Sequence, residues 1–180
     1  MEKEIEREVI MDGKIMTVTK EKVLLDNGNT AYREVVYHHG GVCVLAVKDN
    51  KILLVKQFRY PNRIHTLEIP AGKLEKDEEP IGCAFRELEE ETNHRANNMQ
   101  FLFKFMPSPG YTSEWLYLYE AKDFKEVDDS LEGDEDEFID VVELDIDEAY
   151  NMINKGEITD AKTIIAIMYA YNKQKSYPNG

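Results

Sequence analysis

The chain has 180 residues and a mass of 20.9 kDa, which is enough for one well-filled core and too little for two typical domains. Its net charge of −14 and pI of about 4.7 argue against a nucleic-acid partner, because little basic surface is available to displace phosphate counterions. With no apolar run near the ~18 residues of a membrane span and no signal-peptide core, we expect a cytoplasmic protein without a membrane partner.

The N-terminal part of the chain alternates β-forming residues with turn signals. Asp12-Gly13 and Asn27-Gly28 suit two-residue hairpins, because such turns need positive φ. We therefore predict an antiparallel β-meander over residues 1–36, able to pack apart from a main domain over residues 37–180. The apolar runs GGVCVLAV and KILLVKQFRY follow, and the turn KDNK between them predicts a pair of buried central strands.

After a strand in HTLEIPAG, the pattern predicts a helix from about Pro80 to Thr92, with proline tolerated in its first turn. Strands are expected in MQFLFKFMP, EWLYLYEAKDF and FIDVVEL, and helices from about Asp147 to Lys155 and from near Asp160 onward. Helical spacing assigns Ile81, Ala84, Phe85 and Leu88 to the core in the first helix, and Ile164, Ile165, Met168 and Tyr171 in the last. Cys43 and Cys83 lack metal-ligand spacing and are interpreted as reduced packing residues.

The first helix is unusually acidic. Glu87 and Glu91 are ~40° apart around its axis and Glu90 lies ~60° to the other side of Glu87, so these carboxylates share one stripe. Glu89 points away from the stripe and is expected to be solvated. Carboxylates at this spacing repel unless a cation lies over them, and oxygen ligands favour Mg²⁺ or Mn²⁺. The alternative is a solvated helix face, which is the commoner meaning of a charge run.

The surrounding spacing favours the metal site. Gly72, Glu78, Arg86-Glu87-Leu88 and Glu90-Glu91 follow a pattern that resembles the Nudix box, the signature of hydrolases that act on nucleoside diphosphates linked to another group. The glycine that follows the glutamates in that family is Asn93 here, and Asn is the next-best residue for a left-handed helix end. The next position, usually apolar, is His94. Neither change touches a carboxylate.

The resemblance implies a fold, α+β (α/β), in which a mixed β-sheet is sandwiched between α-helices, and the order of the predicted elements agrees with it. It also implies roles for the residues of the box. Glu87 and Glu91 would be principal metal ligands, Glu90 a further ligand and the Ala71 carbonyl an additional one; Glu78 would pair with Arg86, and Gly72 would supply a backbone conformation that a side chain hinders.

Strings outside the box are similar to the ADP-ribose pyrophosphatase branch of the family, including REVVYHHGGVCVLAV, LLVKQFRYP, LEIPAGKLE, SPGYTSE and GEITDAKT. In these strings Arg33 and Arg59 are candidates for phosphate binding, because a guanidinium holds a pair of phosphate oxygens. Gly110 and Glu114 are further substrate-binding candidates, the latter as an acceptor for a ribose hydroxyl. A surface salt bridge is the alternative for either arginine, and a solvated loop carboxylate for Glu114.

A second acidic run, GDEDEF, is similar in placement to the loop that carries the general base in this branch, which makes Glu135 and Glu137 candidates; a solvated loop is the alternative. The hypothesis is a Mg²⁺-dependent hydrolysis of ADP-ribose to AMP and ribose 5-phosphate, by a homodimer that the N-terminal meander helps to build. Alternatives are a Nudix enzyme for a sugar nucleotide, a dinucleoside polyphosphate or an oxidised nucleotide, and a non-catalytic nucleotide-binding module.

Overall fold

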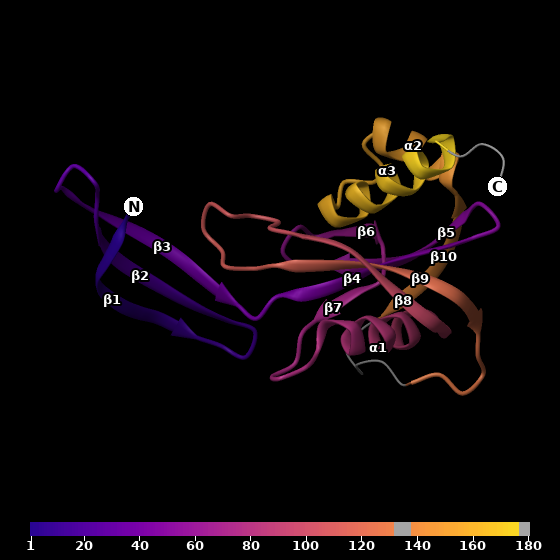
Figure 1. The fold of residues 1–180 in the computed structure, drawn as a ribbon, viewed down its shortest axis with the longest axis horizontal. Coiled ribbons are helices and arrows are strands. Elements are labelled where there is room, and N and C mark those ends of the chain that lie inside the picture. Colours follow the sequence, from indigo (N-terminus) through magenta and orange to yellow (C-terminus); the bar gives the residue numbers. More distant parts are fainter. Residues whose placement is uncertain (132–137, 177–180) are drawn as a thin grey trace.

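Figure 1 shows the computed structural model, which describes residues 1–131 and 138–176. The strands are β1 (Lys3–Asp12), β2 (Met16–Leu24), β3 (Thr30–His38), β4 (Gly41–Lys48), β5 (Lys51–Arg59), β6 (Ile64–Glu68), β7 (Ala71–Lys73), β8 (His94–Phe105), β9 (Leu116–Glu126) and β10 (Ile139–Asp145). The helices are α1 (Pro80–Thr92), α2 (Ile146–Asn154) and α3 (Ala161–Ser176). In the described part of the chain, no helix is long and apolar enough to cross a bilayer.

The antiparallel sheet β1-β2-β3, here called the meander sheet, extends to one side of the rest of the molecule (Figure 1). The predicted meander is therefore present, but its two-residue hairpins are wrong. Residues 13–15 join β1 to β2 and residues 25–29 join β2 to β3, and in these longer loops Gly28 has a positive φ of 82° whereas Gly13 does not. Asp49 and Asn50, with φ of 49° and 65°, form the tight turn between β4 and β5.

The second sheet is mixed, as expected. Its strand order is β10-β5-β4-β9-β8, with β6 paired to β5 and β7 paired to β4. β4 runs parallel to β9 and antiparallel to β5, while the remaining pairs are antiparallel. In Figure 1, α1 covers one face of this sheet, and α2 and α3 cover the other. The predicted sandwich of a mixed sheet between helices is confirmed.

Strand β4 is buried on both faces. Because side chains alternate along a strand, its residues enter two different cores in turn. Val42, Val44 and Ala46 enter the core beneath α1. Cys43 and Leu45 enter the core beneath α2 and α3. Both cysteines are buried and free, as predicted. The apolar run in the sequence is continuous because it serves both cores.

Helix α1 has the predicted bounds. Pro80 begins it, and Asn93 ends it in the left-handed conformation with φ of 57° while its amide donates to the Glu89 carbonyl. Cys83 rather than Ile81 lies in the core beside Ala84 and Leu88, and Ile81 is 45% exposed. That part of the prediction is wrong because two neighbouring helix faces were both partly apolar.

His94 opens β8, which begins five residues before the predicted run. Its ring nitrogen Nδ1 lies 2.7 Å from the Thr92 carbonyl, and the ring packs edge-on against Phe124. His94 therefore takes the apolar position of the box as a half-buried aromatic ring.

Helix α3 turns a different face to the sheet than predicted. Thr163, Ala166, Ile167 and Ala170 are its buried residues, and Met168 is 43% exposed. Ile164, Ile165 and Tyr171 pack along the margin of the core. Small residues let the helix approach the sheet closely, which leaves the larger apolar side chains at the edges of the contact.

Candidate active site

A cleft of about 880 Å³ opens beside the N-terminal end of β4 and the glutamate-bearing side of α1. The predicted site residues that line it are Arg59, Ala71, Gly72, Arg86, Glu87, Glu90, Glu91 and Glu114. These residues come from β5, β7, α1 and the segment before β9, so the mixed sheet and its connections gather them from distant parts of the sequence. The acidic stripe faces this cleft.

Arg86 neutralises part of the stripe. Its Nη1 donates to Glu87 Oε1 and to Glu90 Oε2, each at 2.8 Å. Its Nε and Nη2 donate to the two carboxylate oxygens of Glu78 at 3.0 and 3.1 Å. The guanidinium lowers the pKa of Glu78 through these hydrogen bonds. The expected pair of Glu78 and Arg86 is present, and the same arginine also offsets part of the charge of Glu87 and Glu90.

Gly72 makes room for Glu87. A Cβ atom on Gly72 would lie 1.8 Å from the Glu87 carboxylate, far inside any allowed contact. The φ of Gly72 is outside the left-handed region, so a side chain would be hindered here by the approach of Glu87 and not by the backbone dihedral angles. Glu91 approaches from the same helix and accepts a hydrogen bond from the Ala71 amide at 2.9 Å. β7 is thereby fixed against α1.

Glu89 is a structural residue rather than a solvated one, which corrects the prediction. Its side chain is 9% exposed and receives both arms of the Arg95 guanidinium at 2.8 and 2.7 Å, and the Leu131 amide at 3.2 Å. These contacts lower the pKa of Glu89, chiefly through the hydrogen bonds from Arg95. The side chain points away from the stripe as expected, but β8 and the chain near Leu131 cover that side of the helix.

The substrate-binding candidates divide into those inside and outside the cleft. Arg59 and Glu114 line it, and Glu114 Oε1 lies 3.6 Å from His38 Nδ1. Arg33 lies on the meander sheet and pairs with Glu2. Gly110 lies in a turn and is not among the residues that line the cleft in the described chain. Glu135 and Glu137 lie outside the described residues.

The structure adds lining residues that the sequence reasoning did not propose, among them Gln57, His38, His39, Lys14 and Lys162. Glu68 lies beneath Arg59 and is almost fully buried. A charged residue inside the apolar strand LEIPAG was a usable signal for Glu68, because buried carboxylates require partners. Lys162, in the DAKT string, offers no comparable signal in the sequence.

The donor set of the cleft fits a hard divalent cation. Glu87, Glu90 and Glu91 supply carboxylate oxygens from one helix face, and Gly72 keeps the space that the Glu87 carboxylate occupies. In the described residues no group of three His, Cys, Asp or Glu side chains is arranged to hold an ion, and Glu87 and Glu90 each accept a hydrogen bond from Arg86. A mixed sheet between helical layers, with carboxylates and an arginine facing one cleft, defines an α+β protein whose site suits a divalent cation and an anionic small molecule.

Comparison with known proteins agrees with this class. The sequence profile of the NUDIX domain matches residues 37–166, so the chain belongs to the Nudix family and is a Nudix hydrolase. Nudix hydrolases generally need a divalent metal. A solved structure described as an ADP compounds hydrolase superposes with a TM-score of 0.84 over 97% of this chain and 95% of its own, at 22% identity, which shows the shared fold.

The curated relatives carry different names. ADP-ribose pyrophosphatase of Bacillus subtilis (strain 168) is 44% identical, covering 96% of this chain and 94% of its own. A protein of Bacillus methanolicus named methanol dehydrogenase activator is also 44% identical, covering 93% and 91%. GDP-mannose pyrophosphatase of Yersinia enterocolitica serotype O:8 / biotype 1B (strain NCTC 13174 / 8081) is 37% identical, covering 82% and 83%.

Proposed function

We propose that the protein hydrolyses ADP-ribose to AMP and ribose 5-phosphate. The observation that carries the proposal is the glutamate stripe of α1 facing a cleft that also holds Arg59, in a chain 44% identical to an ADP-ribose pyrophosphatase. In the reaction, water adds to a phosphorus atom and the bond from that phosphorus to the bridging oxygen breaks. The net charge of −14 supports a small substrate rather than a nucleic acid, and the sequence supports a cytoplasmic location without a membrane partner.

Glu87, Glu90 and Glu91 would hold Mg²⁺, with Mn²⁺ as a substitute, and the Ala71 carbonyl would be a further ligand. When bound, the ion supplies Lewis acidity, which offsets the charge of the diphosphate and makes water a better nucleophile. Gly72 supports this assignment, because its missing side chain leaves the Glu87 carboxylate its place in the cleft. The oxygen-rich donor set favours Mg²⁺ over softer metals.

The remaining residues would bind and orient the substrate. Arg59 would hold phosphate oxygens, because a guanidinium has five N–H donors and can bind an anion while it is paired with Glu68. Glu114 would accept from a ribose hydroxyl, and Gly110 would shape the nearby turn. Glu135 or Glu137 would take a proton from water as general base; both lie outside the described residues, and their role depends on the resemblance described above.

We further propose that residues 1–36 form a unit that pairs two copies of the chain, leaving residues 37–180 as the hydrolase domain. The exposed apolar side chains of the meander sheet, which include Ile5, Val9 and Ile10, support a homodimer because such residues favour burial. Arg33 lies on this sheet, outside the cleft of its own chain, and would reach the cleft of the other copy. A monomer by light scattering at assay concentrations contradicts this part and leaves the reaction untouched.

Incubation of the purified protein with ADP-ribose and Mg²⁺, followed by identification of the products, tests the reaction. We expect equal amounts of AMP and ribose 5-phosphate, loss of turnover in excess EDTA, and loss of turnover in Glu87→Gln. Full activity in either case contradicts the metal site. Ile81→Ala, a change on an exposed position of the same helix, is the matched control and should keep wild-type activity.

A second candidate substrate is GDP-mannose, which the 37% identical relative named GDP-mannose pyrophosphatase supports. Parallel assays with ADP-ribose and GDP-mannose separate the two by kcat/KM. If neither is hydrolysed and ADP-ribose still binds, the non-catalytic module is the better description, and the relative named as a methanol dehydrogenase activator then indicates where to look for a regulatory role.

A further inference from the structure

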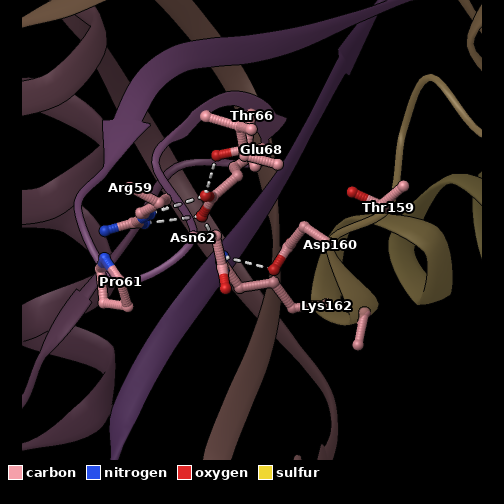
Figure 2. Close-up of a pocket in the computed structure, with 10 residues that line it drawn as sticks. Arg59, Pro61, Asn62, Thr66, Glu68, Thr159, Asp160 and Lys162 are labelled. Atoms are coloured by element: carbon pink, nitrogen blue, oxygen red, sulfur yellow. Dashed lines mark hydrogen bonds and ion pairs between the residues drawn. The ribbon is translucent and has the colours of Figure 1, made fainter.

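A network of charged side chains lies beneath one wall of the cleft. A smaller hollow of about 360 Å³ adjoins this wall between the β5-β6 turn and the start of α3 (Figure 2). Arg59 and Lys162 line both the smaller hollow and the cleft. Glu68 lies between them, so a single carboxylate contacts cations that come from opposite ends of the domain sequence.

Glu68 is held by several donors at once. Its side chain is 3% exposed and receives Arg59 Nε at 2.7 Å and Arg59 Nη2 at 2.6 Å, a two-pronged contact drawn in Figure 2. Thr66 Oγ1 donates to Glu68 Oε1 at 2.5 Å, and Lys162 Nζ donates to Glu68 Oε2. Burial alone would raise the pKa of Glu68, but the hydrogen bonds from Arg59 and the charge of Lys162 outweigh it and lower the pKa to about 2.

Lys162 is fixed from its other side as well. Its Nζ lies 3.1 Å from Asp160 Oδ1. Asp160 Oδ2 accepts from the Thr163 amide at 3.0 Å and from the Thr163 hydroxyl at 2.6 Å, which caps the start of α3. Thr163 in turn accepts from the Ile69 amide at 2.9 Å. β6 and α3 are therefore locked together around the network.

Long cationic side chains lose much rotamer freedom when they are ordered. Arg59 and Lys162 are already ordered by Glu68, so a ligand that binds them does not have to order them. Glu68 holds the Arg59 fork and the Lys162 ammonium while both still line the cleft that the α1 carboxylates face. We propose that Glu68 is a positioning residue that orients Arg59 and Lys162 toward the phosphates of the substrate, and that Lys162 is a further phosphate contact. The proposal deepens the function proposed above and rests on it.

Another buried carboxylate supplies a control. Glu120 on β9 is 7% exposed and accepts from Lys173 Nζ at 2.8 and 2.9 Å, and Lys122 Nζ lies 2.5 Å from it. Glu120 and its lysines are absent from the lining of the cleft and of the smaller hollow within the described chain. Glu68 and Glu120 are thus both buried carboxylates bound to cations. They differ because the cations bound to Glu68 line the cleft and those bound to Glu120 do not.

The test compares Glu68→Gln with Glu120→Gln in steady-state kinetics and thermal melting. Glu68→Gln should raise the KM for ADP-ribose about tenfold, the effect of weakening one charge-assisted contact, with kcat within about threefold of wild type. Glu120→Gln should leave KM unchanged while it lowers the melting temperature. Lys162→Met against Lys173→Met repeats the comparison if Glu68→Gln does not fold. An unchanged KM in both Glu68→Gln and Lys162→Met overturns the proposal.

A double-mutant cycle separates positioning from a general structural role. If Glu68 acts through Arg59, Glu68→Gln should raise KM much less in an Arg59→Met background than in the wild type. Additive effects overturn the positioning role. Calorimetric titration of each variant with ADP-ribose and Mg²⁺ gives the same comparison as binding affinities. If the wild type binds ADP-ribose without turnover, the proposed reaction is refuted. The affinities of the variants still test the role of Glu68 in that case.

Discussion

Replacing Gly72 by alanine tests whether the position of the Glu87 carboxylate controls activity. The added Cβ would meet that carboxylate at 1.8 Å, whereas ordinary contact begins near 3.4 Å. The carboxylate must therefore move by about 1.6 Å. The φ of Gly72 lies outside the left-handed region, so the strand tolerates alanine. The Glu87 carboxylate lies at the end of a flexible side chain, so it is the proposed metal ligand that moves.

A displacement of about 1 Å at a reacting site costs roughly 10²-fold in rate. We therefore expect Gly72→Ala to lower kcat/KM for ADP-ribose at least about 100-fold, with a higher Mg²⁺ concentration for half-maximal rate. The melting temperature should change little. Steady-state kinetics over a Mg²⁺ series, together with a thermal melt, measure these effects.

Gly82→Ala is the matched control. Gly82 lies in α1, and a Cβ there meets nothing within 4 Å. Alanine favours the helix over glycine by about 0.5–1 kcal/mol, so this variant should be slightly more stable and fully active. Wild-type kcat/KM and an unchanged Mg²⁺ requirement in Gly72→Ala would refute the assignment of Glu87 as a ligand whose space Gly72 protects.

Three further outcomes are expected. Asn93→Ala should lower the free energy of unfolding by about 1 kcal/mol because alanine is strained in the left-handed conformation, and Asn93→Gly should not; urea unfolding compares them, and equal stabilities contradict the cap. The pKa of Glu68 is lowered from 4.5 to about 2, so Glu68 contributes about 3 kcal/mol of stability above pH 4.5, which is lost as the pH falls toward 2. Glu68→Gln should therefore weaken the pH dependence of the free energy of unfolding between pH 4.5 and 2. An unchanged pH dependence in this variant contradicts the ion-pair network. EDTA should stop turnover without altering the far-UV circular dichroism spectrum, and added Mg²⁺ should restore it; a collapse of the spectrum would mean that the ion maintains the fold.

The features that the sequence predicted correctly are those set by neighbouring residues. Pro80 and Asn93 define the bounds of α1 through backbone preferences that act within one turn of helix. The pairing of Glu78 with Arg86, which the resemblance to the Nudix box implied, spans eight residues, so one short loop and one helix are enough to bring the two side chains together. Buried runs such as that of β4 are recognisable because a strand covered on both faces needs apolar residues at every position.

The hairpin loops and Ile81 were missed locally, whereas the other missed features depend on chain segments that meet only after folding. Glu89 is covered because β8 returns along α1 and brings Arg95 to it. Glu68 and Lys162 are 94 residues apart, and no local pattern links a strand end to a helix start at that distance. The buried face of α3 was misassigned because helical spacing alone does not distinguish the side chains at the centre of a contact from those at its margin.

Arg86 gives the acidic face of α1 an internal counter-ion. Its guanidinium bridges Glu78, Glu87 and Glu90, so the mutual repulsion of the carboxylates is already relieved when the polypeptide folds. Under the proposed function, a cation that binds Glu87 and Glu90 would compete with this arginine for the same carboxylates.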